Sequence, residues 1–151
     1  MAPLNYQQKI KKEETTQKLL DIFSKNEKED NLHKEFSLYL SFLENSGYFG
    51  ENGFFTYMPF GEKRDAKTGA LLKKKGTKRG VPDFLIIFRR NENSFFCWVE
   101  VKTKKGKQTK EQKDFENKTK EQKNEKYFLI HNLNELIEII ENINKELKWE
   151  N

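Results

Sequence analysis

Residues 80–102, with the sequence GVPDFLIIFRRNENSFFCWVEVK, contain the two most apolar segments of the chain. These segments are DFLIIFR at 83–89 and SFFCWVEVK at 94–102, and four polar residues at 90–93 separate them. Apolar runs of this length, rich in Phe, Ile and Val, predict strands in the middle of a sheet. The short polar connection predicts that the two strands form an antiparallel hairpin.

The register of this hairpin determines which polar side chains meet. If residues 90–93 form the loop, Arg89 pairs with Ser94, and Asp83 then lies directly opposite Glu100. Directly opposed β-carbons are roughly 4.5–5.5 Å apart. Two carboxylates that close repel each other unless a proton or a cation lies between them. A two-residue turn would shift the pairing by two residues and still leave the two carboxylates near each other.

Side chains alternate between the two faces of a strand, and this alternation groups the polar residues. Trp98, Glu100 and Lys102 share one face, whereas Cys97 and Val99 lie on the other. Carboxylates that hold a divalent cation, beside an ammonium group that stabilises developing phosphate charge, suit phosphodiester hydrolysis. A lone Glu-X-Lys on a strand is more commonly a surface ion pair. The hypothesis therefore depends on the opposed carboxylate and on the basic segment that precedes it.

The rest of the chain predicts helices and further strands around the hairpin. The expected order is helix, three strands, helix, strand, helix, which predicts an α/β to α+β fold with a mixed sheet flanked by helices. Residues 1–30 are polar and are expected to form a partly helical extension, which either packs on a partner subunit or is a solvated arm. Residues 31–151 are expected to form one domain. The other predicted elements are a helix at 31–45, a strand at 54–60, a charged helix at 109–124, a strand at 127–130 and an amphipathic helix at 133–147.

One carboxylate falls within the apolar face of the predicted helix at 31–45. At about 100° per residue, Leu38, Tyr39 and Phe42 belong to a broad apolar arc that also contains Glu35. An unpaired buried charge is costly. Glu35 is therefore expected either to have a partner or to lie at the rim of this face.

The positive charge of the chain is concentrated in one segment. The 151 residues carry a net charge of +5, whereas residues 61–82 alone contain eight Lys or Arg against Glu62 and Asp65, a difference of +6. This segment has few apolar residues and is expected to be flexible. A concentrated basic segment favours a polyanionic partner such as nucleic acid.

The remaining chemistry-bearing residues exclude several kinds of site. The single cysteine, Cys97, excludes an intrachain disulfide and a cysteine-based zinc site, and it is expected to be a buried thiol. The two histidines, His33 and His131, are too few for a multi-histidine metal site. Residues 1–12 lack the apolar core of a signal peptide, and no apolar run is long enough to span a membrane. An intracellular protein is expected.

Two short motifs resemble those of a nuclease superfamily. GVPDF at 80–84 and VEVK at 99–102 resemble the PD-(D/E)XK signature, in which Pro-Asp and Glu-X-Lys lie on adjacent strands. More narrowly, the chain resembles the VRR-NUC family. Members of that family have a helix with Glu, a basic segment, G-x-P-D, E-V-K and a helix that carries Gln. The resemblance covers residues 32–130, about two thirds of the chain.

The resemblance implies a phosphodiesterase of the restriction-endonuclease-like fold that depends on Mg²⁺ or Mn²⁺. It implies that Asp83 and Glu100 bind the metal, with the Val101 carbonyl as a third ligand. It also implies that Lys102 orients or polarises the attacking water.

Two outer residues and a basic rim follow from the same resemblance. Glu35 would contribute to a metal directly or through water, and Gln112 would help to place substrate or water. The DNA phosphates would be contacted without readout of base sequence. The cations expected to make these contacts are Lys63, Arg64, Lys73, Lys74, Lys75, Lys78, Arg79, Lys104 and Lys105.

Three functions stay open. The first is a structure-specific endonuclease similar to Holliday junction resolvases, acting as a homodimer because two symmetric cuts need two sites. The second is an endonuclease without junction preference, of the flap, nicking or defence type. The third is a non-catalytic DNA-binding module with the same fold, against which the intact Asp83, Glu100 and Lys102 argue. A dimer interface would lie on the last helix or the N-terminal segment, although ordinary packing within the chain also explains both.

Overall fold

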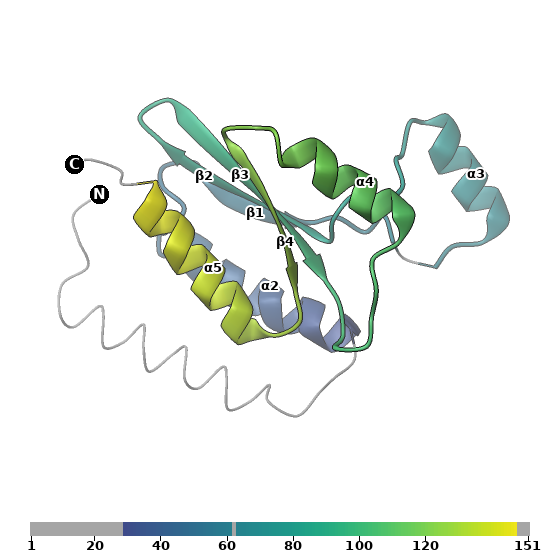
Figure 1. Ribbon diagram of the computed structural model, residues 1–151, viewed down its shortest axis with the longest axis horizontal. Coiled ribbons are helices and arrows are strands. Elements are labelled where there is room, and N and C mark those ends of the chain that lie inside the picture. The colour runs from purple at the N-terminus through teal and green to yellow at the C-terminus, as the bar shows by residue number, and fades with distance from the viewer. Residues whose placement is uncertain (1–28, 62, 148–151) are drawn as a thin grey trace.

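A computed structural model describes residues 29–61 and 63–147, so most of the expected N-terminal extension lies outside the described residues. The expected α+β class is confirmed, because helices flank a four-stranded mixed sheet (Figure 1). None of the described helices is long and apolar enough to cross a membrane. In chain order the elements are α2 (Glu29–Asn45), β1 (Phe54–Tyr57), α3 (Ala66–Lys74), β2 (Phe84–Arg90), β3 (Asn93–Val101), α4 (Lys110–Thr119), β4 (Glu125–Ile130) and α5 (Leu133–Glu146).

The hairpin of β2 and β3 has the predicted register, with Arg89 opposite Ser94. Its connection is shorter than predicted because one more residue pair joins the two strands. Asn91 and Glu92 remain as a two-residue turn, with φ angles of 47° and 67°. Positive φ at both positions is typical of the type I′ turn, whose twist matches that of the flanking strands. In this register Asp83, which directly precedes β2, faces the end of β3.

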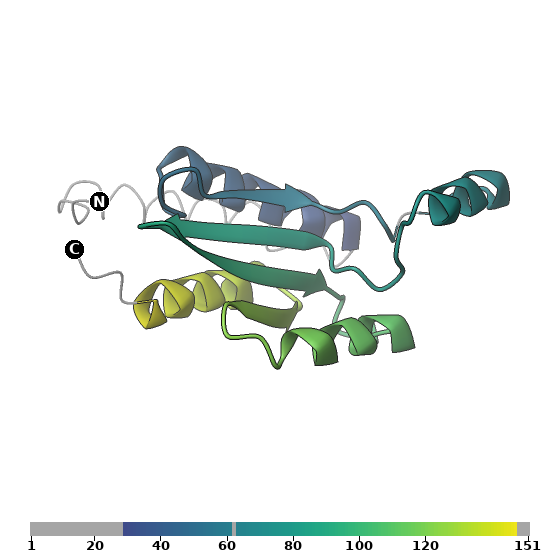
Figure 2. The same ribbon diagram turned by 90° about the horizontal axis from the view of Figure 1, so that it is seen from above.

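The sheet has the order β1-β2-β3-β4, with antiparallel pairs except for the parallel pair of β3 and β4. Helices α2 and α5 contact each other and pack on one face of the sheet, and α4 lies on the other side of the strands (Figures 1 and 2). Most of the core lies between the sheet and the α2–α5 pair. Its fully buried side chains include Phe36, Tyr39, Leu40, Phe84, Phe88, Cys97, Val99, Val101, Leu136 and Ile140.

Three details of the helices and strands differ from the prediction. Leu38, placed in the apolar arc, has an exposed fraction of 49%, because the buried stripe of α2 is narrower than the arc. The predicted strand at 54–60 ends at Tyr57. The charged helix ends at Thr119, whose hydroxyl donates to the Glu116 carbonyl at 2.8 Å, with Lys120 as its C-cap.

The basic segment at 61–82 contains a helix, so the expectation of a flexible segment was wrong for its central part. Asp65 caps the start of α3, because its carboxylate accepts a hydrogen bond from the Thr68 amide at 2.9 Å. Gly76, with φ of 95°, follows the helix, and its amide donates to the Lys73 carbonyl. Helix α3 projects away from the body of the molecule, and it buries none of its residues (Figures 1 and 2).

Candidate metal and nucleic-acid site

Backbone hydrogen bonds hold Asp83 at the junction of three strands. Its carbonyl accepts from the Met58 amide at 2.7 Å, just beyond the end of β1. Its carboxylate oxygen Oδ2 accepts from the Val101 amide at 2.8 Å, at the end of β3. The carboxylate of Asp83 is thereby fixed against β3, the strand that carries Glu100.

Glu100 is the most deeply buried charged residue of the site, with a side chain that is 1% exposed. Its Oε1 atom lies 2.7 Å from Lys102 Nζ and also accepts a hydrogen bond from Gln112 Nε2. Its Oε2 atom is buried and has no hydrogen-bond partner among the described residues. A buried carboxylate oxygen without a donor is costly, so this oxygen is a strong candidate for binding a cation.

Gln112 reaches Glu100 because of how α4 begins. Thr109 caps the helix in a capping box: its hydroxyl accepts from the Gln112 amide, and the Gln112 Oε1 atom accepts from the Thr109 amide at 2.8 Å. The Gln112 Nε2 group is left to donate to Glu100. The first turn of α4 therefore presents one amide side chain to the buried carboxylate.

Gly80 sets the position of this turn relative to the Pro-Asp motif. It has φ of 80°, and a Cβ atom added there would lie 2.4 Å from the backbone of Glu111. Only glycine fits both requirements. The glycine of Gly-Val-Pro-Asp therefore lets the segment before β2 pack directly on the backbone of α4.

Sequence reasoning missed two residues of α2 that lie at the site. Ligand atoms of Glu29, His33 and Asp83 all lie within 4.8 Å of one another, an arrangement that could hold a metal ion. Glu29 Oε1 also lies 3.9 Å from Lys102 Nζ. The i, i+4 spacing of Glu29 and His33 predicts a shared helical face. Only the tertiary packing of α2 shows that this face points toward Asp83.

The histidine leaves a second buried atom without a hydrogen bond. His33 Nε2 lies 3.5 Å from Asp83 Oδ2, which is too long for a good hydrogen bond, and it has no other partner among the described residues. Two unsatisfied buried atoms, His33 Nε2 and Glu100 Oε2, therefore lie in the surroundings of Asp83.

The electrostatics of the site reflect burial and crowded negative charge. Burial, with a further contribution from Asp83, raises the pKa of Glu100 to about 7. Burial lowers the pKa of Lys102, but its hydrogen bond to Glu100 and the surrounding carboxylates outweigh burial and raise it. Burial also lowers the pKa of His33, but Asp83, Glu29 and Asp30 together outweigh burial and raise it.

Glu35 does not join this group. It lies two residues beyond His33, about 200° away around the helix. Its side chain is buried, and no hydrogen bond or ion pair links it to Asp83, Glu100 or Lys102 among the described residues. Burial alone raises its pKa to about 7. The structure thus places Glu29 and His33, rather than Glu35, where a carboxylate of the first helix was expected.

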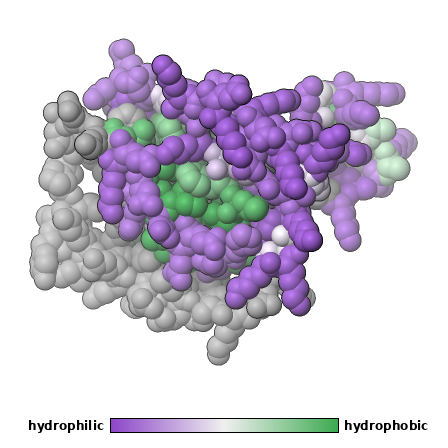
Figure 3. Space-filling view, in the orientation of Figure 1, coloured by the Kyte–Doolittle hydropathy of each residue, from purple (hydrophilic) through white to green (hydrophobic). Residues whose placement is uncertain are grey.

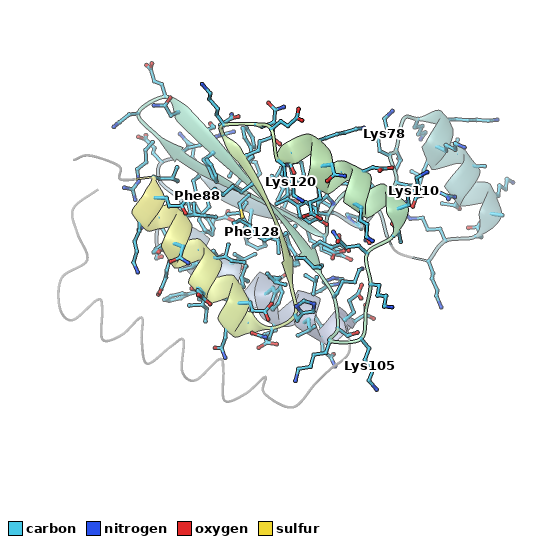
Figure 4. The ribbon with its side chains drawn as sticks, viewed as in Figure 1. Lys78, Phe88, Lys105, Lys110, Lys120 and Phe128 are labelled. Carbon is cyan, nitrogen blue, oxygen red and sulfur yellow. The ribbon has the colours of Figure 1, made fainter. Side chains whose placement is uncertain are left out.

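The cations expected to contact phosphates are all exposed. Lys78, Lys105 and Lys110 lie on the same side of the view as α3, around the start of α4 and the loop after β3 (Figure 4). The exposed basic residues at positions 63–79 are carried by α3 and its flanking segments, and those at 104–105 follow β3: Lys63, Arg64, Lys67, Lys73, Lys74, Lys75, Lys78, Arg79, Lys104 and Lys105.

The donor set fits a hard divalent cation. Asp83 and Glu100 supply carboxylate oxygens, the ligands that Mg²⁺ and Mn²⁺ prefer, and Glu100 Oε2 is buried without a donor. Glu29 and His33 approach Asp83 from a second direction. Asp83 belongs to both possible ligand sets, so it is the residue on which a cation site would depend most.

The chain matches no protein-family model, no curated protein and no solved structure in the three comparisons.

Proposed function

We propose that this protein is a metal-dependent endonuclease that hydrolyses phosphodiester bonds in DNA, with Asp83, Glu100 and Lys102 at its centre. The observation that carries the proposal is the buried Oε2 atom of Glu100. It has no hydrogen-bond partner among the described residues, and it shares its site with a second carboxylate and a lysine. A purely structural ion pair with Lys102 would need only one carboxylate and no orphaned oxygen.

Each residue has a role that its position supports. Asp83 and Glu100 would hold Mg²⁺ or Mn²⁺, and the cation, when bound, would supply Lewis acidity and lower the pKa of a water molecule. Lys102, whose raised pKa keeps it protonated, would donate to a phosphate oxygen or to the attacking water. Gln112 fixes the orientation of Glu100 through its amide. Glu29 and His33 would support Asp83 from α2.

The exposed cations near the site would supply affinity for DNA. Lysine and arginine contacts to phosphates position a duplex without reading its sequence. The described residues contain no zinc-finger ligand set, which supports recognition of DNA shape rather than base sequence. A preference for branched DNA, with two copies of the chain making paired cuts as a Holliday junction resolvase does, is the form of the activity that we propose to test first.

The decisive test compares the wild-type protein with Glu100→Gln and Asp83→Asn on a panel of labelled DNAs. The panel contains four-way junctions, flaps, single strands and linear duplexes, each with Mg²⁺, with Mn²⁺ or with EDTA. We expect roughly a 1,000-fold or greater loss of cleavage in both variants and in EDTA, with DNA binding retained. Paired symmetric cuts confined to junctions would select the resolvase activity, whereas equal cutting of linear duplex would select an endonuclease without junction preference.

The matched control is Glu111→Gln, which removes an exposed carboxylate from the same turn of α4 that carries Gln112. This variant should cleave like the wild type. Wild-type rates in Glu100→Gln or Asp83→Asn would exclude the proposed nuclease site. Binding of DNA without cleavage by the wild-type protein would instead favour a non-catalytic module.

A further inference from the structure

Helix α3 has no packing partner within the described residues. None of its nine residues is buried, and it projects from the body on an arm (Figure 2). A helix of this length is marginal by itself in water, because packing usually supplies most helical stability. Only its caps, such as Asp65, stabilise it locally. A helix with these properties is more fully stabilised when it is bound to another molecule.

The arm presents one exposed large apolar side chain, that of Leu71, with three lysines beside it on the helix surface. Leu71 has an exposed fraction of 52%, the highest of the exposed large hydrophobic residues in the described chain. Lys67, Lys74 and Lys75 stand four residues before it and three and four residues after it, positions that neighbour it on the helix surface. Apolar surface on the arm is bordered by hydrophilic surface in the space-filling view (Figure 3). An apolar centre with a polar rim is typical of interaction sites.

The arm is tethered close to the candidate active site. Six Cα-to-Cα steps connect Thr77, just past the end of α3, to Asp83. Their extended length is at most about 20 Å, which corresponds to about six base pairs of duplex at 3.4 Å per step. Gly80, packed on the backbone of α4, anchors this tether. DNA bound at Asp83 is therefore within reach of Leu71 and its lysines.

We propose that α3 is a DNA-contacting arm on which Leu71 acts as a wedge, packing against unstacked bases at a branch point, while Lys67, Lys74 and Lys75 bind the flanking phosphates. This inference rests on the proposed function and deepens it, because it gives the reason why branched DNA would be preferred. Apolar side chains inserted at base steps hold unstacked or kinked DNA in other DNA-binding proteins. In an intact linear duplex the bases are stacked and leave no gap for a side chain, so Leu71 would contribute much less to binding affinity there.

The positive charge around Leu71 favours nucleic acid, rather than a second copy of the chain, as the partner that binds α3. The exposed surface around Leu71 is cationic at three neighbouring positions. The same surface on another copy would repel it, whereas phosphates attract it and release counterions. A protein partner would have to supply an acidic surface around an apolar contact, and self-association is therefore an outcome to be tested.

The test uses Leu71→Ala in the 151-residue Glu100→Gln chain, so that DNA stays intact and binding is measured directly. Alanine keeps the helix propensity of α3. The control is Leu38→Ala, which truncates another exposed leucine, 49% exposed, on α2. Ligands are a four-way junction and a linear duplex of matched sequence, with 2-aminopurine at the branch point as a reporter of unstacking.

We expect Leu71→Ala to bind the junction about tenfold more weakly and the duplex less than twofold more weakly. A tenfold loss corresponds to about 1.4 kcal/mol, just below the roughly 1.5–3 kcal/mol for burying a whole leucine side chain, as expected when the substitution keeps the β-carbon. The 2-aminopurine fluorescence that the parent protein induces should fall, and Leu71→Met should restore it. Leu38→Ala should behave as the parent.

If Leu71→Ala weakens binding to the junction and to the duplex equally, or leaves the 2-aminopurine fluorescence unchanged, the proposed role of Leu71 as a wedge is wrong. Loss of self-association in sedimentation velocity with unchanged DNA binding would also overturn it, and would identify a second copy as the occupant. The binding assay does not require catalysis. A wild-type protein that fails to cleave would refute the nuclease proposal alone, whereas a Leu71 variant that keeps its junction preference would refute the wedge alone.

Discussion

The two regions of this chain that we expect to meet DNA are held in opposite ways. At the site, the side chains of Asp83, Glu100 and Lys102 are 13%, 1% and 13% exposed, and hydrogen bonds or ion pairs fix each of them. On the arm, no side chain of α3 is buried. Hydrolysis needs groups held in place before the substrate arrives, whereas a phosphate-binding surface gains from being able to adjust to its ligand.

The two regions also differ in what they contribute to the stability of the fold. Crowded carboxylates at the site are unfavourable for folding, because burial and mutual repulsion raise the pKa of Glu100. The core around Phe84 and Val99 holds them together. The arm contributes little to folding, because none of the residues of α3 is buried. Substitutions in the two regions should therefore differ in their effects on unfolding, cleavage and binding.

The largest effect on stability is expected at Gly80, in the segment that connects the arm to the site. Gly80→Ala would strain a backbone with φ of 80° and force a Cβ atom against Glu111. We expect a loss of about 2–4 kcal/mol in the free energy of unfolding, measured by urea denaturation. Displacement of Gln112 and Asp83 should also slow cleavage by about 100-fold.

The control for this substitution is Gly69→Ala on α3. An added Cβ there meets no atom within 4 Å, and alanine is a better helix former. The variant should be as stable as the wild type or slightly more stable, with unchanged cleavage. If Gly80→Ala and Gly69→Ala destabilise the protein equally, the close packing of Gly80 on the backbone of α4 is not what makes Gly80 important for stability.

A smaller effect is expected when the charge of the arm is removed. Lys67→Gln, Lys74→Gln and Lys75→Gln together should weaken DNA binding on the order of 30-fold at physiological salt. They should also reduce the slope of log affinity against log salt by about 2.7, at about 0.9 per phosphate contact. The free energy of unfolding should not change, because all three lysines are exposed. The measurement is a salt titration of binding in the Glu100→Gln background.

The matched control replaces three exposed lysines outside the arm, Lys118, Lys123 and Lys145. If both triple variants weaken binding equally, the effect comes from net charge, and the arm has no special role in binding.

The comparison also shows which features the sequence could predict. The predicted opposition of Asp83 and Glu100 depends on the register of one hairpin, which is a local property, and that register was predicted correctly. The approach of Glu29 and His33 to Asp83 depends on how α2 crosses the sheet, which no local pattern specifies. The periodicity around Glu35 placed it within the apolar face but left open whether it would have a partner or lie at the rim. It is buried, and no local pattern specifies which neighbours it has.

Helix α3 was missed for a different physical reason. It has no buried stripe, so the periodicity that usually predicts a helix is absent. Its local signal was the cap, Asp65 with Thr68 three residues later. A helix that does not pack on the core of its own chain needs no apolar stripe, so apolar periodicity does not predict it.

The smallest effect concerns Glu35, a buried carboxylate outside the two regions. Its pKa is raised by burial to about 7 in the folded chain, against an ordinary value of 4.5. Between these two pH values the folded state binds a proton that the unfolded state has released. Stability therefore falls as the pH rises from about 4.5 to about 7, and it is flat above that range with respect to this group.

Glu35→Gln removes this titration, so the variant should be more stable than the wild type by about 1 kcal/mol at pH 8. At pH 4 the two proteins should differ little in stability, because the wild-type carboxyl is then largely protonated in both states. The measurement is urea denaturation across this pH range, with the exposed Glu138→Gln as the control. If Glu35 bound a catalytic cation as first expected, the substitution would instead reduce cleavage and Mg²⁺-dependent stability. We expect both to remain at wild-type values, because Glu29 and His33 face Asp83 and Glu35 does not.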